Sequence, residues 1–136
     1  MTSEMEEVFG PVISSYSRAQ AIEDGILVDV SETAREARIK FPVAVTRAVW
    51  EDCCEWTEAD SKAKREGQSV RGRLWDVVCM LAFTIRSGRG GEILHYKLSR
   101  IPRPGCGAKR LVTLKAVCGP GDDAAPVICI MLPEED

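Results

Sequence analysis

The side chains with the clearest chemical potential in this sequence are the cations in its second half. Residues 86–115 hold eight basic residues against a single acid, whereas residues 1–60 hold thirteen acids against five bases. In a chain of net charge −3, such segregation is typical of a surface for nucleic acid or an acidic partner, and equally of acidic helices packed beside a basic hairpin. The candidate partner-binding residues are Arg86, Arg89, Arg100, Arg103, Arg110, Trp50 and Arg18.

Hydrolytic or acyl-transfer chemistry would need a nucleophile beside a general base. The one histidine, His95, lies in an alternating segment on the same face as Lys97 and Ser99, where a lone histidine is more often a surface or packing residue. The sequence contains neither a Gly-x-Ser-x-Gly motif nor a Walker-type phosphate loop. We therefore predict no catalytic residue and no cofactor.

Metal or redox chemistry would depend on the six cysteines or on the acids near residue 30. No two cysteines form a Cys-x-x-Cys pair, so reduced, buried thiols are favoured over a zinc site or disulfides. Cys106, in the segment "RPGCGAK", is expected to be the exposed thiol. A hard-metal site would draw on Asp24, Asp29, Glu32 and Glu36, but solvated carboxylates explain these acids more simply. We predict no bound metal.

Short elements are predicted for the N-terminal part from its capping residues. Ser17 can cap a helix that Gly25 ends in a left-handed conformation. Residues 26–30, "ILVDV", have the β-branched and apolar composition of a strand. Ser31 then suits the start of a second helix.

Two longer helices are predicted from hydrophobic periodicity. Apolar residues recur at helical spacing over residues 45–56, which indicates an amphipathic helix. Residues 73–87, which are apolar on nearly all sides from Val77 to Phe83, predict a central, buried helix. Trp50 and Trp56 are six residues apart and cannot share a helical face, so at least one is expected to be partly exposed, as aromatic interface anchors are.

The C-terminal part has the alternating pattern of strands. Residues 92–102, 108–118 and 126–132 predict three consecutive strands with short connections, and thus an antiparallel meander. In the first of them, the face with Tyr96 and Leu98 should point inward. The predicted fold class is α+β, with N-terminal helices packed on a small antiparallel sheet of three to four strands.

The length of 136 residues is sufficient for one domain, spanning residues 1–136, with one hydrophobic core. Its acidic ends, residues 1–14 and 133–136, are expected to be flexible. No apolar run approaches the roughly 18 residues that a membrane helix needs, and the acidic N-terminus does not resemble a signal peptide. We expect a cytoplasmic protein that does not bind membranes.

Several segments in order resemble one family of short uncharacterised bacterial proteins, a domain of unknown function met on plasmids, integrative elements and phages. They are "YSRAQAIEDGILVDVSETAREA", "FPVAVTRAVWEDC", "WTEADSK", "GRLWDVVCMLAF" and "RLVTLKAVCGPGDDAAPVICIMLPEED". The resemblance covers Tyr16 to Asp136. Relatives tend to have Gly in place of Arg38 and Trp in place of Cys79, which affects local packing. The family has no established catalytic residues, so the resemblance implies only an accessory of a mobile element that acts by binding.

Three functions follow from these observations. The leading one is a non-enzymatic, protein-binding accessory of a mobile genetic element, an inhibitor of a host defence complex of the anti-CRISPR or antirestriction type. The alternative is direct nucleic-acid binding through the basic segment 86–115, against which stands the pI of about 5.3. The second alternative is an ADP-ribosyltransferase-like enzyme, because a tyrosine, a short helix, a glycine and an apolar strand follow one another over residues 16–30. It would have a pocket containing Tyr16 and Arg18.

Overall fold

The computed structural model describes residues 17–64, 68–88, 91–101 and 110–135. The helices are α1 (Arg18–Glu23), α2 (Ser31–Glu36), α3 (Arg47–Val49), the π-helical turn η1 (Trp50–Cys54), α4 (Glu58–Lys64) and α5 (Val70–Arg86). The strands are β1 (Leu27–Asp29), β2 (Val43–Thr46), β3 (Ile93–Arg100), β4 (Arg110–Pro120) and β5 (Pro126–Met131).

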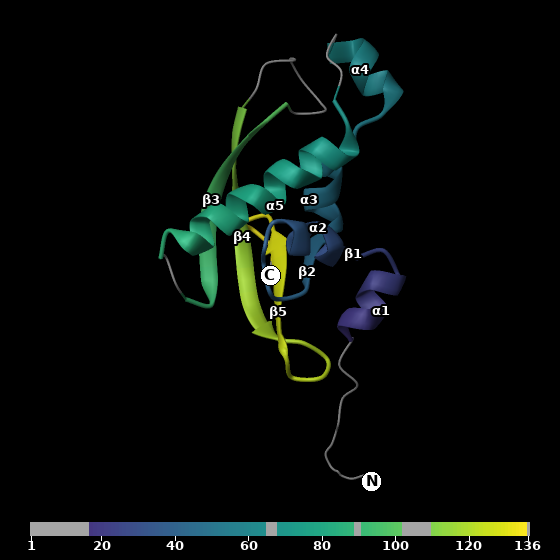
Figure 1. The fold of residues 1–136 in the computed structure, drawn as a ribbon. Coiled ribbons are helices and arrows are strands. Elements are labelled where there is room, and N and C mark those ends of the chain that lie inside the picture. Colours follow the sequence, from purple (N-terminus) through teal and green to yellow (C-terminus); the bar gives the residue numbers. More distant parts are fainter. Residues whose placement is uncertain (1–16, 65–67, 89–90, 102–109, 136) are drawn as a thin grey trace.

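The five strands form one mixed sheet in the order β1-β2-β5-β4-β3. Strands β2 and β5 are parallel, and every other neighbouring pair is antiparallel. Helix α5 lies across the sheet near β3 and β4, while α1 lies at the β1 side (Figure 1). The α+β class is therefore confirmed. The expected sheet of three to four antiparallel strands is corrected to five strands with one parallel pair.

Strand β2 is the main feature that periodicity did not predict. Its residues were expected to begin an amphipathic helix, but Val43, Ala44 and Val45 are fully buried between β1 and β5. Burial on both faces removes the alternation that marks a strand, and the apolar spacing from Val45 onward then matches a helix by coincidence. Helical structure begins only at Arg47, after the Thr46 side chain caps α3.

The predicted capping residue is confirmed at α1 but not at α2, which begins at Ser31 with Val30 as its N-cap and without a side-chain capping hydrogen bond. The Ser17 side chain accepts a hydrogen bond from the Gln20 backbone in a complete capping box, which confirms the predicted helix start. Gly25 has φ +80° and turns the chain into β1, as predicted. At the far end of α2, Arg38 has φ +68°, a left-handed conformation that glycine adopts at lower cost. This is the position where the family resemblance implies glycine.

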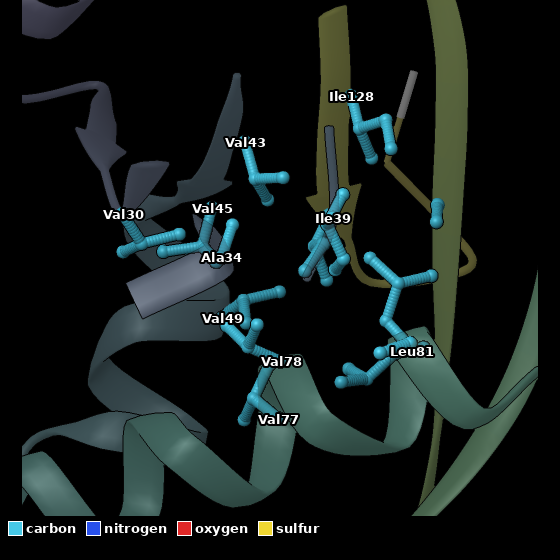
Figure 2. Packing of buried hydrophobic residues seen from close by; sticks show 14 of the residues in the cluster. Val30, Ala34, Ile39, Val43, Val45, Val49, Val77, Val78, Leu81 and Ile128 are labelled. Carbon is cyan, nitrogen blue, oxygen red and sulfur yellow. The ribbon is translucent and has the colours of Figure 1, made fainter. Parts of the chain in front are cut away.

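Helix α5 is not buried on all sides. Val77, Val78 and Leu81 have no exposed surface and belong to the hydrophobic cluster that Figure 2 shows together with Val49, Ile39 and the valines of β2. Phe83 is instead 64% exposed, and Met80, Trp75 and Ile85 are also exposed. The predicted central helix is thus an amphipathic helix that covers one face of the sheet, with apolar residues left over on its other side.

The inward face of β3 was predicted correctly. Tyr96 and Leu98 are buried, and the Tyr96 hydroxyl donates a 3.0 Å hydrogen bond to the Val77 carbonyl of α5.

Near the last strand, Glu135 accepts hydrogen bonds from the Thr46 hydroxyl and the Leu132 backbone N–H. In the described part of the chain, no helix has the length and apolar character needed to cross a membrane.

Candidate binding pocket at the C-terminal end of helix α5

An apolar pocket of about 430 Å³ opens between the C-terminal half of α5 and the sheet. Its floor includes Leu81 of α5 and Ile128 of β5, both part of the hydrophobic core. Phe41 and Ile85 line its mouth and are 41% and 38% exposed. The volume lies in the range of ligand pockets, and an apolar lining beside a few polar groups is typical of binding sites.

Three cations line this pocket together with one acid, Glu92. We call Arg38, Lys40 and Arg86 the rim cations. Arg86 donates from Nη2 to the backbone carbonyl of Ala37, which ties the segment after α2 to the end of α5 and so forms one wall of the pocket. With three cations against one acid, the pocket favours an apolar group that carries negative charge nearby.

The segment after α2 that forms this wall of the pocket begins with Arg38, whose left-handed backbone conformation is strained. The N–H of Arg38 bonds to the Arg35 carbonyl, and the N–H of Ile39 reaches back to Ala34, a pattern that ends a helix through a left-handed residue. Such a conformation costs a non-glycine residue about 1–2 kcal/mol. Arg38 therefore places a cation at the rim of the pocket, although glycine would adopt its backbone conformation with less strain.

A second groove lies on the other side of α5, along strand β3. It has a volume of about 530 Å³ and is lined by Met80 and Phe83 of the helix and by His95 and Lys97 of the strand. Figure 1 shows β3 at the edge of the sheet, with α5 passing in front of it. The C-terminal half of α5 thus separates two exposed apolar surfaces.

The N-terminal half of α5 is closed by polar contacts. Arg73 is 4% exposed, and its guanidinium donates to the carbonyls of Ile101 at 3.0 Å and Asp52 at 3.1 Å. The same guanidinium lies over the Trp56 ring, 4.7 Å from its centroid. Arg100 forms an ion pair with Asp52 at 2.9 Å. We call Asp52, Trp56, Arg73 and Arg100 the arginine cluster.

Among the described residues, the predicted basic residues Arg86 and Arg100 do not lie at the same site. Arg86 lies at the pocket, whereas Arg100 belongs to the arginine cluster. Arg73 of that cluster comes 13 residues before Arg86 on α5, which corresponds to about 20 Å at 1.5 Å per residue. Arg110 is exposed at the start of β4, opposite Arg100 in the strand pairing. Arg89 and Arg103 lie outside the described residues.

The two candidate residues from the N-terminal half are held by the fold. Arg18 donates from its backbone N–H to Asp122 at 2.9 Å and from Nη2 to the Ile128 carbonyl at 3.3 Å. Trp50 is half-buried and packs against the core, so the expected partial exposure of at least one tryptophan is confirmed, although Trp56 is buried and lies beyond the helical turn that ends at Cys54. Tyr16, which the enzyme hypothesis places in a pocket with Arg18, lies outside the described residues.

Sequence analysis missed Phe41, Arg38 and Lys40 as pocket residues. They lie in a short connection between α2 and β2, where neither periodicity nor spacing points to a site. One signal was available in α5, because its apolar residues are too many for a single buried face. Exposed Ile85 and Phe83 are that surplus.

The buried thiols are poor nucleophiles. Burial raises the pKa of Cys53 to about 11, with a further increase from Asp52, and burial raises that of Cys54 to about 12. Both thiols are therefore protonated near neutral pH. Cys106 lies outside the described residues.

Asp29, one of the candidate metal-binding acids, accepts a hydrogen bond from the Ser31 hydroxyl at 2.6 Å. Within the described ranges, no three candidate metal ligands are grouped together.

The fold is that of a small α+β protein with an apolar pocket rimmed by cations. Over residues 5–136 the chain matches the model of a family of unknown function, DUF6573, and it belongs to that family. The resemblance to an uncharacterised domain family is thus confirmed. No curated protein and no solved structure shows significant similarity to the chain.

Proposed function

We propose that the protein acts by binding a partner protein, which inserts an apolar side chain flanked by acidic residues into the pocket at the C-terminal end of α5. The observation that carries this proposal is the pairing of an apolar pocket with the three rim cations. Apolar anchors that fill such pockets dominate the energy of many protein interfaces. Charges around them set partner choice and association rate.

The partner class comes from the resemblance to proteins of plasmids, integrative elements and phages. On that basis we propose that the protein is an accessory of a mobile element and inhibits a host defence complex of the anti-CRISPR or antirestriction type. This part of the proposal rests on association and not on geometry. Among the described residues, the division of the basic segment between the pocket and the arginine cluster weighs against the nucleic-acid alternative, since cations gathered on one face are the usual footprint of a nucleic-acid site.

The test compares two matched substitutions on α5. Ile85 and Trp75 are almost equally exposed, at 38% and 39%, but only Ile85 lines the pocket. We expect tagged wild-type protein and Trp75→Glu to retain the same stoichiometric protein after nuclease treatment, and Ile85→Glu to lose it. Equal retention by both variants contradicts the pocket. Loss of capture upon nuclease treatment contradicts protein binding and supports nucleic acid.

A further inference from the structure

Strand β3 has one edge that no strand pairs with among the described residues. The Cys118 N–H donates to the Glu92 carbonyl at 2.8 Å, which sets the phase of the antiparallel ladder between β3 and β4. Hydrogen-bonded pairs alternate along such a ladder, so the even-numbered residues from Leu94 to Arg100 bond to β4. The N–H and C=O groups of Ile93, His95, Lys97 and Ser99 therefore point to the open edge.

Apolar side chains of α5 line one side of this edge. Phe83 is 64% exposed and Met80 is 37% exposed, and both line the groove that also contains His95 and Lys97. The groove thus continues around the strand, from the helix side of the sheet to its outer face. An added strand would place alternate side chains on these two sides. One set would meet Phe83 and Met80, and the other set would lie beside Lys97.

We infer that the open edge of β3 binds an extended segment of the partner protein by strand addition, with apolar residues toward α5 and acidic residues toward Lys97. Backbone hydrogen bonds would supply affinity, and the alternating side chains would supply selectivity. This inference rests on the proposed function, because it specifies the shape and charge of the segment by which the partner binds. It adds a second contact beside the pocket, on the opposite side of the C-terminal half of α5.

Charge argues for an acidic partner segment and against a second copy of this chain. The outward-facing residues of the edge are Ile93, His95, Lys97 and Ser99, and none of them is acidic. Pairing two β3 strands would bring two copies of Lys97 close together, and lysine on an edge strand is a common device against self-association. An acidic strand would convert this repulsion into attraction.

Synthetic peptides can test the edge without the natural partner. The probe is a nine-residue peptide of alternating Glu and Val, and the control has Lys in place of Glu. We expect saturable binding of the Glu peptide, with NMR shifts concentrated at the backbone amides of Ile93, His95, Lys97 and Ser99. Two further probes carry N-methyl groups on the Glu amides or on the Val amides. One set should abolish binding and the other should change it less than twofold, because only alternate amides face β3.

Variants of the full-length protein give the matching controls. Lys97→Glu should weaken the Glu peptide about fivefold and strengthen the Lys peptide by a similar factor. Phe83→Ser should weaken the Glu peptide about tenfold, and Trp75→Ser should leave it unchanged. Absence of saturable binding at millimolar peptide, tolerance of both methylation patterns, or shifts confined to other strands overturns the inference.

The natural partner separates this inference from the proposed function. The strand inference is wrong, and the proposed function stands, if the captured protein no longer binds the Ile85→Glu variant but binds the Lys97→Glu and Phe83→Ser variants as tightly as it binds the wild-type protein. If Ile85→Glu keeps the partner while Lys97→Glu loses it, the pocket is wrong and the edge is the binding site.

Discussion

The arginine and aromatic side chains at the two ends of helix α5 differ in their burial and in their contacts. At the N-terminal end, both arginines of the arginine cluster are held by groups of the chain itself: Arg73 bonds to two backbone carbonyls and lies over Trp56, and Arg100 pairs with Asp52. At the C-terminal end, the rim cations surround an apolar pocket and Phe83 is 64% exposed. One end is closed by the chain's own groups, and the other is open.

This difference shows that a cation's role depends on what surrounds it and not on its place in a basic segment. Burial lowers the pKa of Arg73, while the carbonyls of Asp52 and Ile101 and the Trp56 ring replace part of the hydration that its guanidinium loses. Arg86 uses one nitrogen for the Ala37 carbonyl and remains exposed. We therefore expect substitutions at the closed end to affect stability and substitutions at the open end to affect binding.

The largest effect is expected from removing the buried cation. Arg73→Met should lower the free energy of unfolding by about 3–5 kcal/mol, because the carbonyls of Asp52 and Ile101 lose their donors and the Asp52 carboxylate loses a nearby charge. Arg71→Met, two residues earlier on the exposed face of the same helix, should change it by less than about 0.5 kcal/mol. Urea unfolding measures both. Similar losses in the two variants would mean that the arginine cluster is not a stabilising unit.

A second pair of substitutions tests the two faces of α5 near its open end. Leu81 has no exposed surface, so Leu81→Ala should cost about 2–5 kcal/mol through lost burial and the cavity left behind. Phe83→Ala removes a larger side chain but should cost less than about 1 kcal/mol, because most of that ring is in water. Thermal or urea unfolding distinguishes them. A Phe83→Ala loss equal to that of Leu81→Ala would show that the open end is closed in solution.

Alkaline pH should destabilise the closed end through its thiols. The ordinary thiol pKa of 9.0 rises to about 11 at Cys53 and about 12 at Cys54 in the folded state, because both side chains are buried. Above pH 9 the unfolded chain therefore releases protons that the folded protein retains, and stability falls as pH increases. The stabilisation is fully present below pH 9, and we expect a loss of about 2–3 kcal/mol between pH 8 and pH 10 for the two thiols together.

Urea titrations at pH 8, 9 and 10 measure this dependence, and the Cys53→Ala/Cys54→Ala double variant is the control. The double variant should start less stable and lose much less stability over the same range. Burial also raises the pKa of Tyr96 well above its usual value, which adds a loss of the same sign above pH 10. An equal pH dependence in both proteins would mean that these thiols are not the groups that titrate.

Local chemistry in the sequence predicted local structure well. The Ser17 cap, the Gly25 turn and the inward face of β3 all depend on one residue type or on strict alternation, and each was confirmed. Strand β2 could not be predicted in this way, because its burial between β1 and β5 is a property of strand order. Three consecutive residues buried by neighbours from distant parts of the chain carry no period of their own.

The candidate site was predicted less well for a related reason. Arg86 was identified from charge alone, but the pocket needs Phe41 from the connection before β2 and Ile128 from the last strand. The parallel pairing of β2 with β5 brings these distant segments together, and nothing in local composition encodes it. Likewise, the sequence contains no indication that Arg100 meets Asp52 whereas Arg86 faces a pocket.

The smallest predicted effect concerns the backbone at the open end. Arg38 and Ala124 have nearly identical left-handed φ values, +68° and +69°, and neither is glycine. Replacing either by glycine relieves strain of about 1–2 kcal/mol but makes the unfolded chain more flexible, so each variant should gain only about 0.5–1 kcal/mol of stability.

The two variants should differ in binding, which makes Ala124→Gly a matched control for Arg38→Gly. Arg38 is a rim cation, whereas Ala124 lies in the exposed turn between β4 and β5. Arg38→Gly should therefore slow association with the captured partner, more strongly at low salt, while Ala124→Gly leaves it unchanged. Urea unfolding measures the stability gain, and surface plasmon resonance at two salt concentrations measures the rate. If both variants gain stability and bind alike, Arg38 is only a helix terminus, and the charge asymmetry between the two ends of α5 depends on Lys40 and Arg86 alone.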